Sequence, residues 1–384
     1  MPIRSGWSGR PGRFEKKTSR APRKTGALVY SKIDENNMGD KMNIQIGKVE
    51  NEELRTTLFS QYKAHVTMML QETEPEMKPI SDEMAMQWLD DKYDVSIRNY
   101  AFEGEKIVGD AEIYLRKPDD PEYELNKGLG YIFGYVEPEY RNRGIGTSLA
   151  KKAFLDIKDS CVHTISSHSY SEEGNRFLQK FGVPSSVFSD MRLELDGFDW
   201  NIVDGLLKIA EKSENNWKIE LHTKITDQFI DDVSDLSFAT AVEFRKMNNQ
   251  ETIDLREAEK KKWQDSREFL EKFRQYRCFL VKDANGVVIG FTEGGIDNEN
   301  TYRFIQYVTA VDAGHRGSGI GKLLKALMLD HIRQNNPQVK MITTGNNDLN
   351  APMLGINSRL GFKKHRTEIS YKIRVEEASK RLGI

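Results

Sequence analysis

Two short glycine-rich segments hold the residues best suited to chemistry. One reads Arg141-Asn142-Arg143-Gly144-Ile145-Gly146, and the other reads Arg316-Gly317-Ser318-Gly319-Ile320-Gly321. Glycines let an anion approach the backbone N–H groups, and an arginine nearby adds positive charge. The pattern is therefore typical of a loop that binds phosphate.

The flanking residues predict that each segment joins a strand to a helix. After the second segment, Ile320, Leu324 and Ile332 recur on one helical face, and Ile145, Leu149 and Ile157 do so after the first. The start of a helix has unpaired N–H groups and the positive end of the helix dipole, which favours a bound anion. The alternative is a turn that only lets strand and helix pack closely.

Two other phosphate-binding motifs are excluded by their spacing. A Walker A loop needs Gly-Lys-Ser/Thr, whereas the segments continue Gly321-Lys322-Leu323 and Gly146-Thr147-Ser148. The dinucleotide motif G-x-G-x-x-G would need a glycine where Lys322 stands.

The two segments belong to an internal repeat. Residues 134–149 match residues 309–324 at one offset, which pairs Arg141 with Arg316. Upstream, the extended run 106–112 parallels 287–293, and each run follows a turn containing glycine. A chain of 384 residues has room for two domains. The sequence therefore predicts two copies of one domain.

The motif R-x-x-G-x-G between a strand and a helix resembles the coenzyme A pyrophosphate loop of the GNAT superfamily of N-acetyltransferases. The second copy adds Thr344-Gly345-Asn346 and the run Asn350 to Phe362, which is similar to the T-x-N…N-x-P-M…I-N-x-x-L-G-F segment of many members. The resemblance covers roughly residues 42–195 and 218–374. It implies an α/β fold, more exactly an α+β mixed sheet, in two GNAT-like acyl-CoA N-acyltransferase domains arranged in tandem.

The resemblance implies acetyl-CoA as the cofactor and an acyltransferase activity. It places catalysis in the second copy, because Ser171 of the first copy stands where the second has Asn350. The residues expected to bind coenzyme A lie in and around the two loops and at the start of the later helix of the second copy. They are Val311, Arg316, Gly317, Ser318, Gly319, Ile320, Gly321, Lys322 and Asn350, with Val136, Arg141, Arg143, Gly144, Gly146 and Thr147 in the first copy.

Acetyl transfer to an amine needs a base that removes a proton and a donor that stabilises the oxyanion. Glu293 is the candidate base, on the strand expected to border the acetyl site, and its alternative is a solvated strand face. Glu112 is its counterpart in the first copy. The family supplies the oxyanion donor from a backbone N–H, here near Val311. Asn357 occupies the late-helix position where family members often have a tyrosine acid.

Tyr371 is a further candidate acid, and its alternative is a core residue with a wet hydroxyl. Asn350 is a candidate for bonding the pantetheine arm, with helix capping as its alternative. No metal site is expected, because two cysteines cannot form a cysteine-rich zinc site.

The repeat also sets the expected domain boundaries. We expect a basic, disordered leader at 1–41, a first domain at 42–197, a linker helix at 198–217 and a second domain at 218–384. The leader is rich in arginine and lysine, which is compatible with a nucleic-acid-binding arm, a transit peptide or a mere leader. With no recognisable fold around it, nucleic acid is not expected as a partner.

The amino-acid composition limits the classes of protein to which the chain can belong. The formal charge is −2 and 30% of residues are charged, as in soluble globular proteins. No apolar run approaches the roughly 20 residues that cross a bilayer, so no membrane partner is expected, and the absence of a secretory signal favours the cytoplasm.

The expected partner is a small-molecule amine. Two alternatives stay open: a coenzyme A-binding regulatory protein without catalysis, and a protein acetyltransferase. The two domains could pair as a pseudo-dimer within the chain, and the chain could also form a homodimer.

Overall fold

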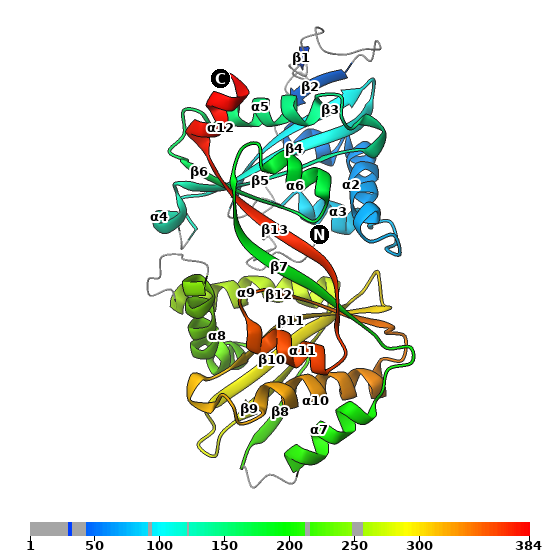
Figure 1. The fold of residues 1–384 in the computed structure, drawn as a ribbon, viewed down its shortest axis with the longest axis vertical. Helices are drawn as coiled ribbons and strands as arrows, with labels where there is room; N and C mark the ends of the chain where they lie inside the picture. Colours follow the sequence, from blue (N-terminus) through cyan, green and yellow to red (C-terminus); the bar gives the residue numbers. More distant parts are fainter. Residues whose placement is uncertain (1–29, 33–43, 91–93, 121–122, 212–215, 248–255) are drawn as a thin grey trace, which may run out of the picture. The chain divides into compact units, whose positions relative to one another are not determined.

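The computed structural model describes residues 30–32, 44–90, 94–120, 123–211, 216–247 and 256–384, which form two compact units (Figure 1). The first unit takes the described residues up to Ser185 together with Ile369–Ile384. The second unit is Ser186–Glu368. None of the helices in the described ranges is long and apolar enough to cross a membrane.

The first unit is built on a mixed sheet whose strands follow the order β1-β2-β3-β4-β5-β6-β13. Its strands are β1 (Tyr30–Lys32), β2 (Ile44–Lys48), β3 (Asp94–Glu103), β4 (Lys106–Arg116), β5 (Leu129–Val136), β6 (Thr164–Ser169) and the end of β13 (Lys363–Arg374). The β5–β6 pair is parallel, and the other pairs are antiparallel. Its helices are α1 (Asn51–Arg55), α2 (Phe59–Thr73), α3 (Asp82–Trp88), α4 (Tyr123–Asn126), η2 (Pro138–Tyr140), α5 (Ile145–Ile157), α6 (Glu172–Leu178) and α12 (Val375–Leu382).

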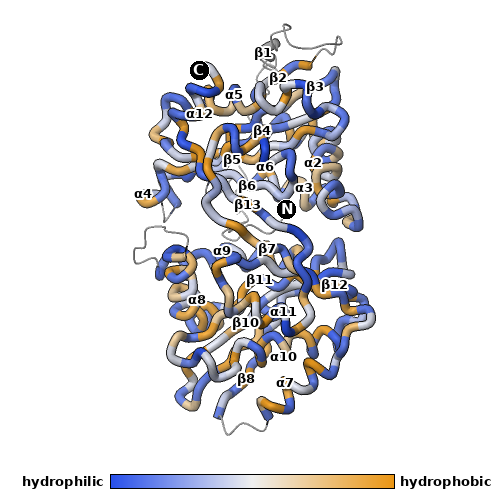
Figure 2. The backbone as a smooth tube through the Cα atoms, viewed as in Figure 1, coloured by the Kyte–Doolittle hydropathy of each residue, from blue (hydrophilic) through white to orange (hydrophobic). Residues whose placement is uncertain are grey.

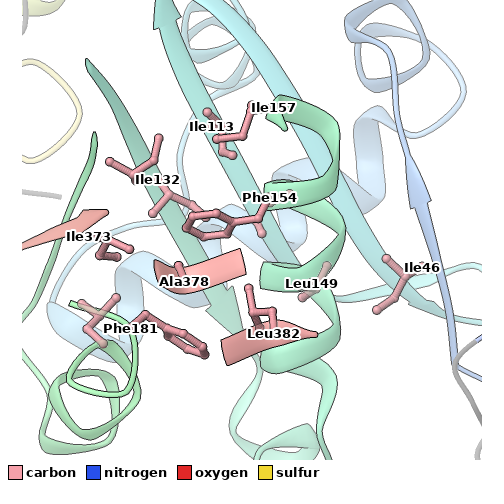
Figure 3. Packing of buried hydrophobic residues seen from close by; sticks show 14 of the residues in the cluster. Ile46, Ile113, Ile132, Leu149, Phe154, Ile157, Phe181, Ile373, Ala378 and Leu382 are labelled. Carbon is pink, nitrogen blue, oxygen red and sulfur yellow. The ribbon is translucent and has the colours of Figure 1, made fainter. Parts of the chain in front are cut away.

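The core of the first unit lies between the sheet and α5 (Figure 3). Leu149 and Phe154 of α5 pack there with Ile113 and Ile132 of the sheet. Leu382 of the last helix, α12, completes the same cluster. The final helix of the chain therefore belongs to the core of the first unit.

The second unit repeats this plan with strand order β7-β12-β11-β10-β9-β8. Its strands are β7 (Val183–Glu194), β8 (Lys218–His222), β9 (Arg274–Lys282), β10 (Val288–Asp297), β11 (Arg303–Val311) and β12 (Met341–Asn347). Its helices are α7 (Asn201–Glu211), α8 (Asp227–Met247), α9 (Arg256–Phe273), η3 (Ala313–His315), α10 (Ile320–Asn335) and α11 (Ala351–Arg359). Side chains of α10 pack in one cluster, and those of α8 and α9 pack in another.

Each sheet is completed by a strand from the other half of the sequence. Residues 188–194 of β7 pair with β12 in the second unit, although they follow the first copy of the repeat. Residues 369–374 of β13 pair with β6 in the first unit, although they follow the second copy. The chain therefore enters the second unit within β7 and returns to the first within β13.

The local patterns predicted from the sequence are confirmed. Ile320, Leu324 and Ile332 are buried along α10, and Ile145 and Leu149 are buried along α5. Hydrophobic residues recur between hydrophilic ones along the helices, as expected for helices with one buried face (Figure 2). The mixed α/β architecture with two tandem domains is also confirmed.

The division into two units differs from the predicted boundaries, since the first unit gives way to the second after Ser185 and not after residue 197. Residues 369–384 belong to the first unit and not to a second domain ending at 384, because Ile373, Ala378 and Leu382 are buried in the first core. The predicted linker helix is α7, which packs on α10 within the second unit. Of the predicted leader, 30–32 form β1, paired with β2, and the rest of 1–41 lies outside the described residues.

Candidate active site

The glycine loop of the second unit lies between β11 and α10. Gly317 and Gly319 have φ values of +82° and +95°, a left-handed conformation that L side chains rarely adopt. A Cβ added at either position would meet nothing within 4 Å. The glycines are therefore required by the backbone path, and they leave the start of α10 open to a ligand.

The loop of the first unit has the same conformation between β5 and α5. Gly144 has a φ of +80°, and Asn142, in the place of Gly317, has a φ of +61°. Asparagine is among the few residues that tolerate this conformation. Gly144 and Gly319 are the N-cap residues of α5 and α10, and neither helix start has a side-chain cap.

In each unit, the arginine shared by the two loops pairs with a carboxylate. The Arg141 Nε donates to the Val136 carbonyl at 2.9 Å, and its Nη2 lies 2.6 Å from Glu72. In the second unit, the Arg316 Nε donates to the Val311 carbonyl at 3.2 Å. Its Nη2 contacts both oxygens of Glu243, at 2.7 and 2.9 Å. The positive charge predicted for these loops is thus partly neutralised by Glu72 and Glu243.

In both units the sheet opens beside the loop. The parallel pair β11–β12 is hydrogen-bonded over Arg303–Ile305, and the remainder of β11 pairs with β10. In the first unit, β5 pairs with β6 over Leu129–Tyr131 and then with β4 alone among the described residues. Each sheet therefore has a wedge between two parallel strands that leads to the glycine loop.

The remaining residues predicted to bind the cofactor lie around these loops. Ser318 Oγ donates to the His315 carbonyl, and the Arg143 guanidinium lies over the Tyr140 ring. A Cβ at Gly321 would touch Ile356 of α11 and Val311, and one at Gly146 would approach Phe177 and Val136. Ile320 is buried as the first residue of α10, whereas Lys322 is half-buried and Thr147 is exposed.

Glu293 is buried beneath α8 and α9, on the strand predicted for the base. It is 7% exposed, and its carboxylate accepts a hydrogen bond from Tyr276 Oη at 3.0 Å. Burial raises the pKa of Glu293 to about 7, although the Tyr276 hydrogen bond and the charge of Lys262 act in the opposite direction. A solvated strand face is therefore excluded, and the pKa matches that of a general base near neutral pH.

A bulge lies opposite Glu293 in the β10–β11 pair. The register shifts between Thr292 and Gly294, where Thr292 faces Thr309 and Gly294 faces Gln306. Buried Gln306 donates to Thr292 Oγ1 at 2.9 Å and to Thr309 Oγ1 at 3.2 Å, which holds the irregular segment in place. The corresponding pair β4–β5 keeps a regular register from Gly109 to Leu115. The second sheet alone has this distortion next to its candidate base, within the described strands.

Asn357 is fully buried on α11. Its Nδ2 lies 3.8 Å from the Met191 sulfur, and its Oδ1 has no hydrogen-bond partner among the described residues. A buried amide oxygen without a partner is costly, and a bound ligand would supply one. Asn350 caps α11, since its Oδ1 accepts from the Met353 N–H at 3.3 Å.

Tyr371 belongs to the first unit, whereas Glu293 belongs to the second. It lies in the part of β13 that completes the first sheet, is fully buried in the first core and donates from Oη to Asn175 Oδ1 at 3.2 Å. The sequence predicted that Tyr371 lies in the second domain, because the repeat does not show that the end of β13 joins the first sheet. Tyr307, at the bulge, does lie near Glu293, and burial raises the pKa of Tyr307 to about 12.

Glu112 has the same strand position in the first unit but a different environment. It accepts hydrogen bonds from Tyr100 and Tyr114 and pairs with the buried Arg98 guanidinium. These contacts compensate the charge of Glu112. The two copies therefore share the position of the carboxylate but differ in the side chains around it.

Sequence reasoning missed a buried histidine in the first unit. His65 of α2 is 2% exposed, and its Nε2 lies 2.9 Å from Asp110 Oδ1. Its Nδ1 lies 3.5 Å from Glu137, and the two carboxylates raise the pKa of His65 to about 9 against the opposing effect of burial. The sequence places this histidine among the apolar positions of α2, which could have indicated its burial. Its partners lie far away in the sequence and could not be predicted from it.

Both units have an open sheet with a glycine loop at the start of a helix. The model of the acetyltransferase (GNAT) family matches residues 64–182 and again residues 244–362. The chain belongs to the acetyltransferase (GNAT) family, with two domains of it in tandem.

Two relatives match this chain over 62% of its length. The chain is 27% identical to the mycothiol acetyltransferase of Saccharomonospora viridis over 251 residues, covering 62% of this chain and 72% of the relative. It is 24% identical to the mycothiol acetyltransferase of Amycolatopsis mediterranei, covering 62% of this chain and 73% of that one.

A solved structure shares the fold across both units. A tandem GNAT protein from the clavulanic acid biosynthesis pathway aligns with a TM-score of 0.67 and 17% identity, over 86% of this chain and 98% of its own. A GCN5-related N-acetyltransferase from Sphaerobacter thermophilus aligns with a TM-score of 0.54 and 14% identity, over 86% and 96%. The predicted family and the tandem organisation are thus confirmed, and the chain is an N-acetyltransferase enzyme.

Proposed function

We propose that this enzyme transfers the acetyl group of acetyl-CoA to a primary amine of a small molecule, and that the second unit carries the catalysis. The observation that carries the proposal is the buried Glu293 beside the bulged β11, on a sheet whose wedge leads to the Gly317–Gly321 loop. The names of the two relatives, both mycothiol acetyltransferases, favour a small-molecule acceptor.

The residues present fit coenzyme A. The open N–H groups at the start of α10 suit a pyrophosphate, since the glycines at Gly317 and Gly319 leave room for it. The buried Asn357 Oδ1 lacks a partner, and a pantetheine amide N–H would supply one. When bound, acetyl-CoA supplies a thioester that a neutral amine can attack.

Groups around the wedge carry out the proton transfers and stabilise the oxyanion. An ammonium group with a pKa near 10 must lose a proton before it attacks. Glu293 is half-ionised near pH 7 and takes that proton, directly or through one water. A backbone N–H of β11 near Val311 stabilises the oxyanion. Tyr307, which is buried near Glu293 at the bulge, is the proposed acid in place of Tyr371.

Thiol release tests the proposal directly. Full-length protein would be mixed with acetyl-CoA and a panel of primary amines, with free thiol measured over time and the products identified by mass. Amine-dependent thiol release with an acetylated product is expected. Thiol release that does not respond to any amine, with coenzyme A still bound, would contradict the assignment of a small-molecule amine.

A further inference from the structure

Two aromatic rings meet across the wedge of the first unit. Phe133 of β5 and His168 of β6 each lie two residues beyond the last pair of the parallel ladder, Tyr131–Ser166. Their ring centroids are 5.1 Å apart and the ring planes are inclined at 72°. This is the edge-to-face arrangement of aromatic rings in contact. The two side chains therefore bridge the gap between the strands where the sheet begins to open.

Further rings support this pair on both sides. The centroid of the Tyr114 ring of β4 lies 5.8 Å from that of Phe133, and the centroid of the Tyr170 ring lies 5.9 Å from that of His168. The backbone of His168 is held as well, because β6 pairs with β13 there, opposite Ser370. A row of four rings thus runs from β4 across the wedge to the residue that follows β6.

The bridge lies on the face of the sheet that carries Glu112. Phe133 is the direct cross-strand partner of Glu112, and paired residues of neighbouring strands share a face. The adjacent residues Ile113 and Ile132 point instead into the core beside α5, which begins at the glycine loop. A flexible arm that starts at the glycine loop must therefore pass between β5 and β6 to reach Glu112, and the two rings lie in its way.

The corresponding position in the second unit has no side chain. Gly345 of β12 matches His168, since it lies two residues beyond the last pair of the parallel ladder, Ile305–Thr343. Gly345 is exposed, and a Cβ added there would meet nothing within 4 Å. The wedge of the second unit is therefore open at the place where the wedge of the first unit is bridged.

We propose that Phe133 and His168 close the wedge of the first unit to the pantetheine arm of coenzyme A, so that each chain binds one coenzyme A molecule, in the second unit. The inference rests on the proposed function, in which coenzyme A binds at a glycine loop with its arm in the wedge. It also accounts for the proposed assignment of catalysis to the second unit, because a thioester held at the first loop could not reach the face that carries Glu112.

Counting the sites by calorimetry tests the proposal. Coenzyme A without an acetyl group would be titrated into the full chain, so that no turnover occurs. The wild-type chain should bind one molecule. Gly319→Asp, whose second loop carries a repelling charge, should lose that site, and Gly144→Asp should keep it.

Opening the first wedge should create a second site. The double variant Phe133→Val/His168→Gly removes both rings and reproduces the glycine found at Gly345, and it should bind two molecules of coenzyme A. Adding Gly144→Asp should return the number to one. His168→Phe is the matched control, because it keeps a ring across the wedge and should bind one molecule. Urea unfolding of each variant identifies those that are folded.

The reverse change should close the second wedge. Gly345→His has room for its side chain and should weaken coenzyme A binding by about tenfold or more, the equivalent of about 1.4 kcal/mol. Gly345→Ala is the control and should bind as the wild type does. An unchanged affinity in the folded Gly345→His protein would count against the inference.

Two sites in the wild-type chain, or a single site in the folded double variant, would overturn the inference alone. The same holds if the wild-type site is lost in Gly144→Asp and kept in Gly319→Asp. Failure of both the wild type and the double variant to bind coenzyme A at all would instead overturn the proposed function.

Discussion

At the scale of single residues, the two matched carboxylates differ in their surroundings. Glu293 and Glu112 occupy matched strand positions, and the repeat alone gives no reason to separate them. Glu293 has one neutral hydrogen-bond partner, and burial raises its pKa to about 7. Glu112 is paired with Arg98 and held by two tyrosines. A sequence cannot show this difference, because it depends on which side chains the fold places around each carboxylate.

Glu293→Gln should therefore lower kcat/KM by about 10²–10⁴-fold, the usual contribution of a general base. Wild-type kcat/KM should rise with pH through about 7 as Glu293 loses its proton, and the variant should lack that rise. Initial rates between pH 5.5 and 9 would show it. Glu112→Gln is the control, and a similar loss in that variant would argue against Glu293 as the base.

Lys325 of α10 offers a second test at this scale. It is 3% exposed, has no carboxylate within ion-pair distance among the described residues and lies over the Phe362 ring at 5.6 Å. Burial lowers the pKa of Lys325 to about 7. The unfolded state thus binds more protons between about pH 7 and 10.5, so this residue's contribution to stability improves as pH rises through that window.

Lys325→Met should raise the free energy of unfolding by about 2 kcal/mol at pH 6, because it removes a buried charge without opening a cavity. The advantage over wild type should shrink toward pH 10. Urea unfolding of both proteins at several pH values would measure it. A gain that grows with pH would show that Lys325 is not a buried cation in the folded chain.

At the scale of elements, helices and loops were predictable and strand partners were not. The spacing of Ile320, Leu324 and Ile332 predicted α10, and the positions of Gly317 and Gly319 predicted the turn before it. These patterns are local. Pairing of β13 with β6 joins residues about 200 positions apart, and nothing in the periodicity of either strand specifies it.

The exchange of strands predicts that residues late in the sequence stabilise the first unit. Ile373 is 1% exposed in the first core, and Ile373→Ala should cost about 2–5 kcal/mol there. Amide hydrogen exchange should speed up in β5 and β6. Ile342→Ala in β12 is the matched change in the second unit, and it should affect β10 and β11 instead. Faster exchange confined to β10–β12 in Ile373→Ala would refute the strand assignment.

At the scale of the whole chain, two similar units have diverged around one shared scaffold. Both keep a left-handed glycine at the start of a helix, an arginine tied to a strand carbonyl and a wedge between parallel strands. The second unit has a bulged strand beside a buried, weakly paired glutamate. The first unit has buried charged residues beside a cavity. The repeat and the family were predictable, since glycine loops are short local motifs. The different surroundings of the matched residues depend on contacts that only the fold reveals.

The assignment of catalysis to the second unit is tested most directly by a matched pair of loop variants. Gly319→Asp and Gly144→Asp each place a negative charge where a phosphate would bind. Gly319→Asn and Gly144→Asn are neutral controls of the same shape, and the chain itself tolerates asparagine in this loop at Asn142. Acetyl transfer to the best amine of the panel should fall at least about 100-fold in Gly319→Asp, in line with losing charge stabilisation in a binding site. It should stay near wild type in Gly319→Asn and in Gly144→Asp. Loss of activity in Gly144→Asp with full activity in Gly319→Asp would contradict the account, because it would place the chemistry in the first unit.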